Sequence, residues 1–130
     1  MIQALNLWHS VPVVLLRRSQ CLLAIGIFIH EALSPNPDAM QFHISAVILH
    51  FVGNILLFSS LWFAFYDYLK PKVLFIVALC FSLSIEAAQG FIVGRDPNLF
   101  DAATNVTGIL FGWLLCSGVQ RLLPSVFKKA

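Results

Sequence analysis

Four long apolar stretches, separated by short segments rich in proline, glycine and charged residues, dominate the pattern of this chain. The stretches run roughly over Pro12–Leu33, His43–Tyr66, Pro71–Val93 and Asp101–Leu123. A helix that crosses a bilayer needs about 20 mostly apolar residues, and each stretch reaches that length. The pattern therefore predicts an all-α fold, an integral membrane bundle of four transmembrane helices.

The segments between the stretches suggest where the helices begin and end. Pro71, in "DYLKPK", suits the first turn of a helix, and Asp101 is a candidate N-cap. Arg17 and Arg18 interrupt the first stretch, and we expect both to reach toward the headgroups, with the embedded part beginning near Ser19. Because more apolar stretches follow, we expect a retained helix rather than a cleaved signal peptide.

The composition supports a membrane protein. Of the 130 residues, 59% are hydrophobic and 11% are charged, with a mean hydropathy of +0.87, whereas soluble proteins carry roughly 25% charged residues. The length fits one domain over residues 1–130. A net charge of +2 gives no support for a nucleic-acid partner. Cys21, Cys80 and Cys116 lie apart in apolar runs, so we expect buried thiols, with no metal and no cofactor.

Lysine and arginine positions predict the orientation, because cytoplasmic loops of membrane proteins are enriched in both. With the N-terminus inside, seven cationic residues fall on the cytoplasmic side and Arg95 alone falls outside. Both termini are therefore expected inside. The seven are Arg17, Arg18, Lys70, Lys72, Arg121, Lys128 and Lys129.

Several polar residues are expected at one level of the membrane, on the outer side. Glu86 lies seven residues before the end of the third stretch and His50 seven residues after the start of the second, each about 10 Å deep. Asn105 lies near the outer start of the fourth stretch, below the loop that carries Arg95. Polar groups inside a membrane are costly and usually face the bundle interior, where they indicate a functional site.

Helical spacing places these residues on shared faces. Small residues that continue one polar face would let two helices pack closely below a polar pocket that opens outward. The faces carry Glu86 and Gln89 (i, i+3), His50 and Asn54 (i, i+4), and Asp101, Asn105, Gly108 and Gly112 (i, i+4, i+7, i+11).

Purely structural roles compete with this interpretation. Asp101 fits a helix cap, and Arg95 paired with Glu86 or Asp96 would simply hold the loop. Gln89 and Asn105 fit interhelical hydrogen bonds of the kind that stabilise membrane bundles. The coincidence of His50 and Glu86 at one depth favours a functional site.

The ordered set of motifs resembles the VanZ-like family of small bacterial membrane proteins, named after a teicoplanin-resistance protein. The resemblance covers roughly residues 34–115 and departs from many relatives at Ala46 and Val47, where they carry an acidic-basic pair. It implies a cell-envelope role, with an effect on glycopeptide susceptibility, in the bacterial plasma or inner membrane. The motifs are His50-Phe51, Glu86-x-x-Gln89, Gly94-Arg95-x-Pro97 and Asp101-x-x-x-Asn105-x-x-Gly108-x-x-x-Gly112.

Two functional hypotheses follow, beside a packing role alone. In the first, the pocket binds an envelope precursor or a lipid headgroup, with Arg95 on a phosphate or carboxylate. In the second, the protein is an intramembrane enzyme acting on an envelope lipid or peptide, in which Glu86 and His50 form an acid/base pair or Asp101 and His50 help to hold a divalent ion. Membrane lipid is a partner in either case, and a homo-oligomer is left open. The expected ligand-binding residues are His50, Glu86, Gln89, Arg95, Asp101 and Asn105.

Overall fold

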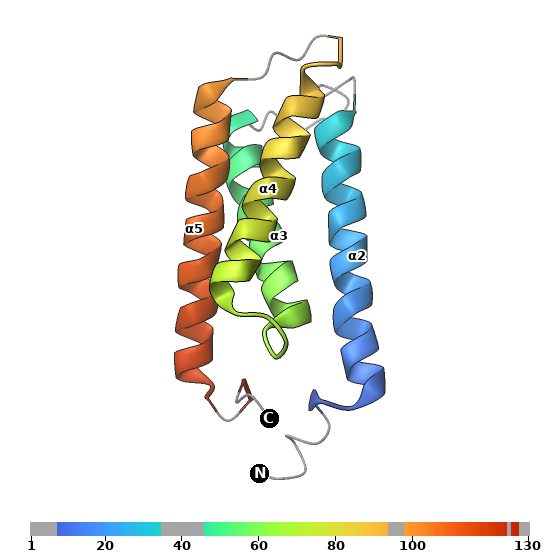
Figure 1. Cartoon of the computed structure of the whole chain (residues 1–130), viewed down its shortest axis with the longest axis vertical. Helices are drawn as coiled ribbons and strands as arrows, with labels where there is room; N and C mark the ends of the chain where they lie inside the picture. Colours follow the sequence, from blue (N-terminus) through green and yellow to red (C-terminus); the bar gives the residue numbers. More distant parts are fainter. Residues whose placement is uncertain (1–7, 35–45, 94–97, 125, 128–130) are drawn as a thin grey trace.

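The computed structural model describes residues 8–34, 46–93, 98–124 and 126–127. Over these residues the chain forms four helices, labelled as in Figure 1: α2 (Val11–Leu33), α3 (Ala46–Phe65), α4 (Pro71–Gln89) and α5 (Leu99–Leu122). All four are long and apolar enough to cross a membrane, and no strand occurs in this part of the chain. The predicted all-α fold with four membrane-spanning helices is confirmed.

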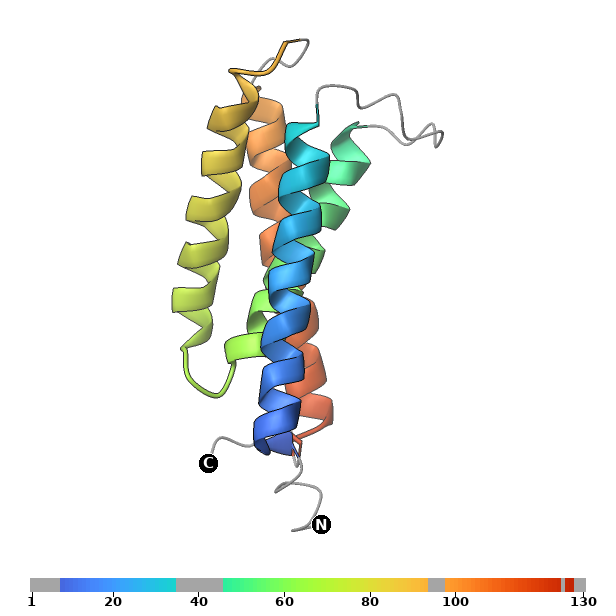
Figure 2. The same cartoon turned by 90° about the vertical axis from the view of Figure 1, so that its right-hand side faces the viewer.

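Successive helices run in opposite directions, so the two ends of the bundle are built from different residues (Figure 1). At the end that we call the Arg17 end, α2 and α4 begin while α3 and α5 end. At the other, the Glu86 end, α2 and α4 finish while α3 and α5 begin. Figure 2 shows α4 at the left and α2 in front of α3 and α5, and α3 contacts each of the other three helices.

Apolar side chains cover both the inside and the outside of the bundle. Phe58 and Ile109 are fully buried between helices, whereas Leu22 and Leu114 are each at least 70% exposed. A helix that is apolar all round belongs in a core or in lipid. Since the outward faces have no protein partner here, the bilayer is the solvent that they require.

Two glycines of α5 explain why it packs so closely on α3. A Cβ atom at Gly108 would lie 2.5 Å from the backbone oxygen of Phe51 and 2.9 Å from Cβ of Asn54, and one at Gly112 would lie 3.1 Å from the oxygen of Ile55. The close approach predicted from the Gly-xxx-Gly spacing is therefore present, and it is specific to the α3–α5 contact.

Two helix boundaries differ from the sequence prediction. The helix α4 ends at Gln89, with Gly90 as its C-cap, rather than near Val93. Glu86 therefore lies only about 4.5 Å, or three residues, from the helix end. The N-cap of α5 is Asn98, whose side chain accepts a hydrogen bond from the backbone of Phe100, so the expectation that Asp101 caps this helix is wrong.

The expectation that Arg17 reaches toward the headgroups is also wrong. Its side chain does not extend toward headgroups, because it is 1% exposed. The guanidinium donates to Asp67 Oδ1 at 3.0 Å and to the backbone oxygen of Phe63 at 2.8 Å, and its carbon lies 4.7 Å from the centre of the Tyr66 ring. A paired charge is stable inside a bundle where an isolated one is not.

The three cysteines are not equivalent. Cys21 and Cys116 are buried as expected, but Cys80 is exposed on α4. The prediction of three buried thiols is therefore wrong at one position, since an apolar run in a membrane helix does not distinguish its lipid side from its core side.

Candidate functional site

The Glu86 end contains a buried polar network built from three helices, which we define as His50, Asn54, Glu86 and Asn105. Asn105 is central: its Oδ1 lies 3.0 Å from His50 Nδ1 and accepts from Asn54 Nδ2 at 2.7 Å. Its Nδ2 donates to Glu86 Oε2 at 3.4 Å. The structure thus brings His50 and Glu86 to one level through a shared asparagine, although no direct bond between them occurs in the described residues.

Glu86 also fixes the start of α5. The backbone N–H of Asn98 donates to Glu86 Oε1 at 3.1 Å, while Asn98 caps the helix with its own side chain. Both carboxylate oxygens of Glu86 therefore accept a hydrogen bond. With 7% of the residue exposed, this carboxyl is nearly enclosed by protein.

Asn54 is a member of the network to which the sequence analysis gave no role. It is completely buried, and its Nδ2 donates to the backbone oxygen of His50 at 2.8 Å as well as to Asn105. The i, i+4 spacing from His50 was the available signal. Its Oδ1, like the hydroxyl of buried Ser82 one turn below Glu86, has no hydrogen-bond partner among the described residues.

The other expected site residues lie outside this network or outside the described residues. Gln89 is 4% exposed, and its Nε2 donates to the backbone oxygen of Ala32 at 2.9 Å, which ties α4 to the end of α2. Asp101 lies in the first turn of α5, and its carboxyl forms no hydrogen bond with another described residue. Arg95 falls outside the described residues, as does Asp96.

A metal site can be tested against the side chains present. Within the described residues, no three His, Cys, Asp or Glu side chains lie close enough together to hold a metal ion. His50 and Asp101 therefore lack a third such ligand in this part of the chain. The polar network offers amide and carboxylate oxygens instead, which suit hydrogen bonding.

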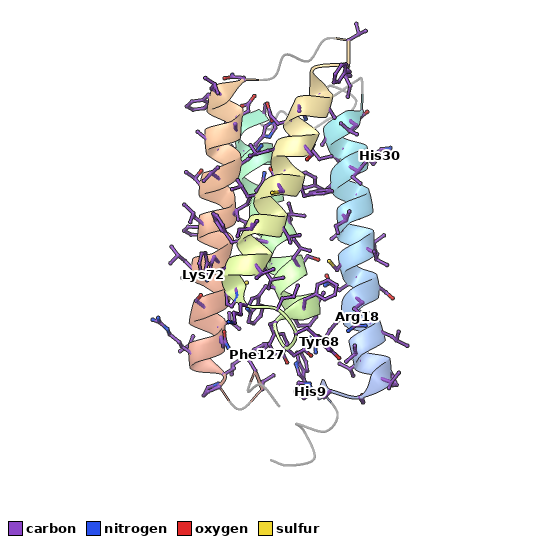
Figure 3. The ribbon with its side chains drawn as sticks, in the orientation of Figure 1. His9, Arg18, His30, Tyr68, Lys72 and Phe127 are labelled. Carbon is purple, nitrogen blue, oxygen red and sulfur yellow. The ribbon has the colours of Figure 1, made fainter. Side chains whose placement is uncertain are left out.

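A second polar cluster, at the Arg17 end, was missed because its partners are far apart in sequence. Besides the Arg17–Asp67 pair, His9 Nδ1 lies 3.7 Å from Asp67 Oδ2, and Trp8 Nε1 donates to the Tyr66 hydroxyl. Figure 3 shows His9, Arg18, Tyr68 and Phe127 at this end, and His30 on the outer side of α2 near the other. Aromatic rings and a buried ion pair therefore fill the Arg17 end of the bundle.

A groove of about 490 Å³ lies between α2, α3 and α5, and it is lined mostly by apolar side chains together with Gln20, Ser59 and Ser60. None of its lining residues belongs to the polar network. Its lining is mostly apolar and lies within the helical spans, so it is not the polar pocket that the sequence predicts.

Four membrane-length helices around a buried polar network define a small multi-pass membrane protein. The chain belongs to the VanZ/LLP1 family, whose model matches residues 5–123, most of its length. No curated protein and no solved structure matches the chain. The family assignment therefore agrees with the resemblance drawn from the motifs.

Proposed function

We propose that this protein binds the headgroup of an envelope lipid, or of an envelope precursor, at the Glu86 end of its bundle. The observation that carries the proposal is a nearly buried carboxylate held together with an imidazole by one asparagine, at the rim of a membrane bundle. Polar groups so placed are expensive in lipid, and a binding role explains their retention better than packing does. Arg95, in the adjoining loop, would supply a cation for a phosphate or carboxylate.

The cationic side chains favour an orientation with the Glu86 end outside a bacterial plasma or inner membrane. Arg18, Lys70, Lys72 and Arg121 all belong to the Arg17 end, where α2 and α4 begin and α5 ends. Cytoplasmic loops are enriched in such residues. The binding site would then face the compartment in which envelope lipids and precursors are exposed, and occupying it would lower susceptibility to teicoplanin-type glycopeptides.

The test extracts the protein with its surrounding membrane and measures which lipids are enriched over the bulk. We expect one class of envelope lipid or precursor to be enriched with the wild type, and to be lost with Asn105→Ala, which disconnects His50 from Glu86. Gln120→Ala, on the same helix near its other end, is the matched control and should retain the lipid. Thermal unfolding in detergent verifies that both variants fold. Equal lipid profiles for wild type and Asn105→Ala would contradict the proposal.

An intramembrane enzyme is the second candidate, favoured by the carboxyl of Glu86 and the imidazole of His50 at one level. The geometry supports it less well, because both side chains contact Asn105 rather than each other. Turnover of labelled envelope lipids by the purified protein, abolished by Glu86→Gln, would replace binding with catalysis as the function of these residues.

A further inference from the structure

The donor and the acceptor of each hydrogen bond in the network can be assigned, starting from the backbone carbonyl of His50. The oxygen of His50 can only accept, so the Asn54 atom that faces it at 2.8 Å is the donor Nδ2. The same Nδ2 faces Asn105 at 2.7 Å, so the atom of Asn105 there is the acceptor Oδ1. The amide of Asn105 is thereby oriented, with its Nδ2 toward Glu86.

This assignment determines which atoms of His50 and Glu86 donate hydrogen bonds and which accept them. Because Asn105 Oδ1 accepts, His50 Nδ1 carries the proton of that contact, which leaves Nε2 as the acceptor whenever the ring holds a single proton. Glu86 accepts from the backbone N–H of Asn98 and from Asn105 Nδ2. Each oxygen of Glu86 thus accepts a hydrogen bond, as in an ionised carboxylate, which can only accept.

Most of the hydrogen-bonding positions that remain unused in the network are acceptors. A carboxylate has about four lone-pair sites, of which the contacts to Glu86 use two. The unpartnered Oδ1 of Asn54 adds a further acceptor, and so does His50 Nε2, whereas Asn105 Nδ2 uses one of its two N–H groups on Glu86. Glu86 forms no ion pair with another described residue. A buried negative charge among acceptors needs a partner that is positive and rich in donors.

We propose that the network binds the primary ammonium group of a lipid headgroup. An ammonium carries three N–H donors and one positive charge, which matches the charge of Glu86 and the acceptor Nε2 of His50. A lipid source fits the position of Glu86 within the last turn of a membrane-length helix. This inference rests on the proposed function and names the group of the ligand that the network would bind.

The experiment varies the number of N–H donors at constant charge and constant acyl chain, and adds phosphatidylglycerol as an anionic lipid without an ammonium group. The full-length wild-type protein is placed in nanodiscs that contain equal amounts of phosphatidylethanolamine, its N-methyl and N,N-dimethyl derivatives, phosphatidylcholine and phosphatidylglycerol, and the retained lipids are measured by native mass spectrometry. We expect retention to fall stepwise as methyl groups replace N–H, by at least about tenfold between the first and the trimethylated lipid, because tenfold corresponds to about 1.4 kcal/mol, roughly the contribution of a single charge-assisted hydrogen bond.

Two variants assign the effect to the network. Glu86→Gln should abolish the preference, because it removes the charge while keeping the shape. Glu31→Gln is the matched control, a carboxylate on α2 at the same end whose side chain is 43% exposed, and it should behave as the wild type does. If Glu86→Gln does not fold, the methylation series with wild-type protein alone decides the matter.

The outcomes separate this inference from the function on which it rests. Equal retention of the ethanolamine and choline lipids, or a preference that survives in folded Glu86→Gln, would overturn the ammonium site. Selective retention of phosphatidylglycerol would also overturn it, yet would leave headgroup binding intact. Displacement of the lipid by soluble phosphorylethanolamine would overturn the lipid as the source. Loss of all headgroup selectivity would contradict the inference and the proposed function together.

Discussion

At the scale of single residues, the protein holds two buried charges in different ways. Arg17 has an ion-pair partner, Asp67, and three aromatic rings within 6 Å of its guanidinium carbon. Glu86 has hydrogen bonds from an amide and a backbone N–H but no ion pair within the described residues. Arg17 has an opposite charge beside it even though its Nη1 has no hydrogen-bond partner among the described residues, whereas a buried carboxylate held only by neutral donors remains attractive to a cation. This contrast is why we propose the Glu86 end, rather than the Arg17 end, as the ligand site.

Tyr66, just beyond the end of α3, gives a pH-dependent prediction. Burial raises the pKa of Tyr66 above its ordinary value near 10, and the nearby charge of Arg17 only partly offsets this. Because the folded protein then holds the phenolic proton more tightly than the unfolded chain, the stabilisation is present below pH 10 and is lost as the pH rises toward the folded pKa.

The chain has two tyrosines, so each can be titrated alone by its absorbance. In Tyr68→Phe, where Tyr66 remains, we expect ionisation with a midpoint above 10. In Tyr66→Phe, the melting temperature should fall less steeply above pH 10 than in the wild type. A midpoint at or below 10 for Tyr66 in folded protein would show that Arg17, rather than burial, dominates this site.

At the scale of helices, hydropathy predicted the elements well and their ends less well. The start of α4 at Pro71 was correct because proline suits the first turn of a helix. The end of α4 was placed too late, since Phe91, Ile92 and Val93 continue the apolar run although the helix stops at Gln89. Hydropathy measures preference for lipid and does not report which backbone hydrogen bonds form.

The contact between α3 and α5 depends on Gly108. Replacing it with alanine would bring a Cβ atom to 2.5 Å from the Phe51 backbone oxygen, so α5 must move away. Overpacking of this kind costs about 1–3 kcal/mol. Since Asn105 lies one turn from Gly108, Gly108→Ala should lower the melting temperature in detergent and also weaken lipid retention at the polar network.

Gly118→Ala is the control on the same helix. A Cβ atom there would meet nothing within 4 Å, and alanine is the better helix former by about 1 kcal/mol. We expect unchanged or slightly raised stability and unchanged lipid retention. A loss of stability in Gly118→Ala equal to that in Gly108→Ala would attribute the effect to the helix rather than to the α3–α5 contact.

At the scale of the whole molecule, the sequence predicted the grouping of polar residues but not how they bond. Depth and helical spacing placed His50, Glu86 and Asn105 together, and the structure connects them. Spacing alone could not show that Asn54 orients Asn105, because rotamers and amide directions depend on neighbours from another helix. It also missed the Arg17–Asp67 pair, whose members are 50 residues apart, because nothing local marks a contact at such a separation.

The two ends of the bundle lead to a final prediction, on its orientation. Arg18, Lys70, Lys72 and Arg121 belong to one end and the polar network to the other, so the positive-inside bias directs the network outward. A fluorescent protein fused after Ala130 should be active, and a phosphatase that works only outside the cytoplasm should be inactive there. The same phosphatase inserted between Asp38 and Ala39, in the α2–α3 loop, should be active. The reverse pattern would place Glu86 at the cytoplasmic face, where any ligand would have to come from the inner leaflet and an effect on glycopeptides would lose its physical basis.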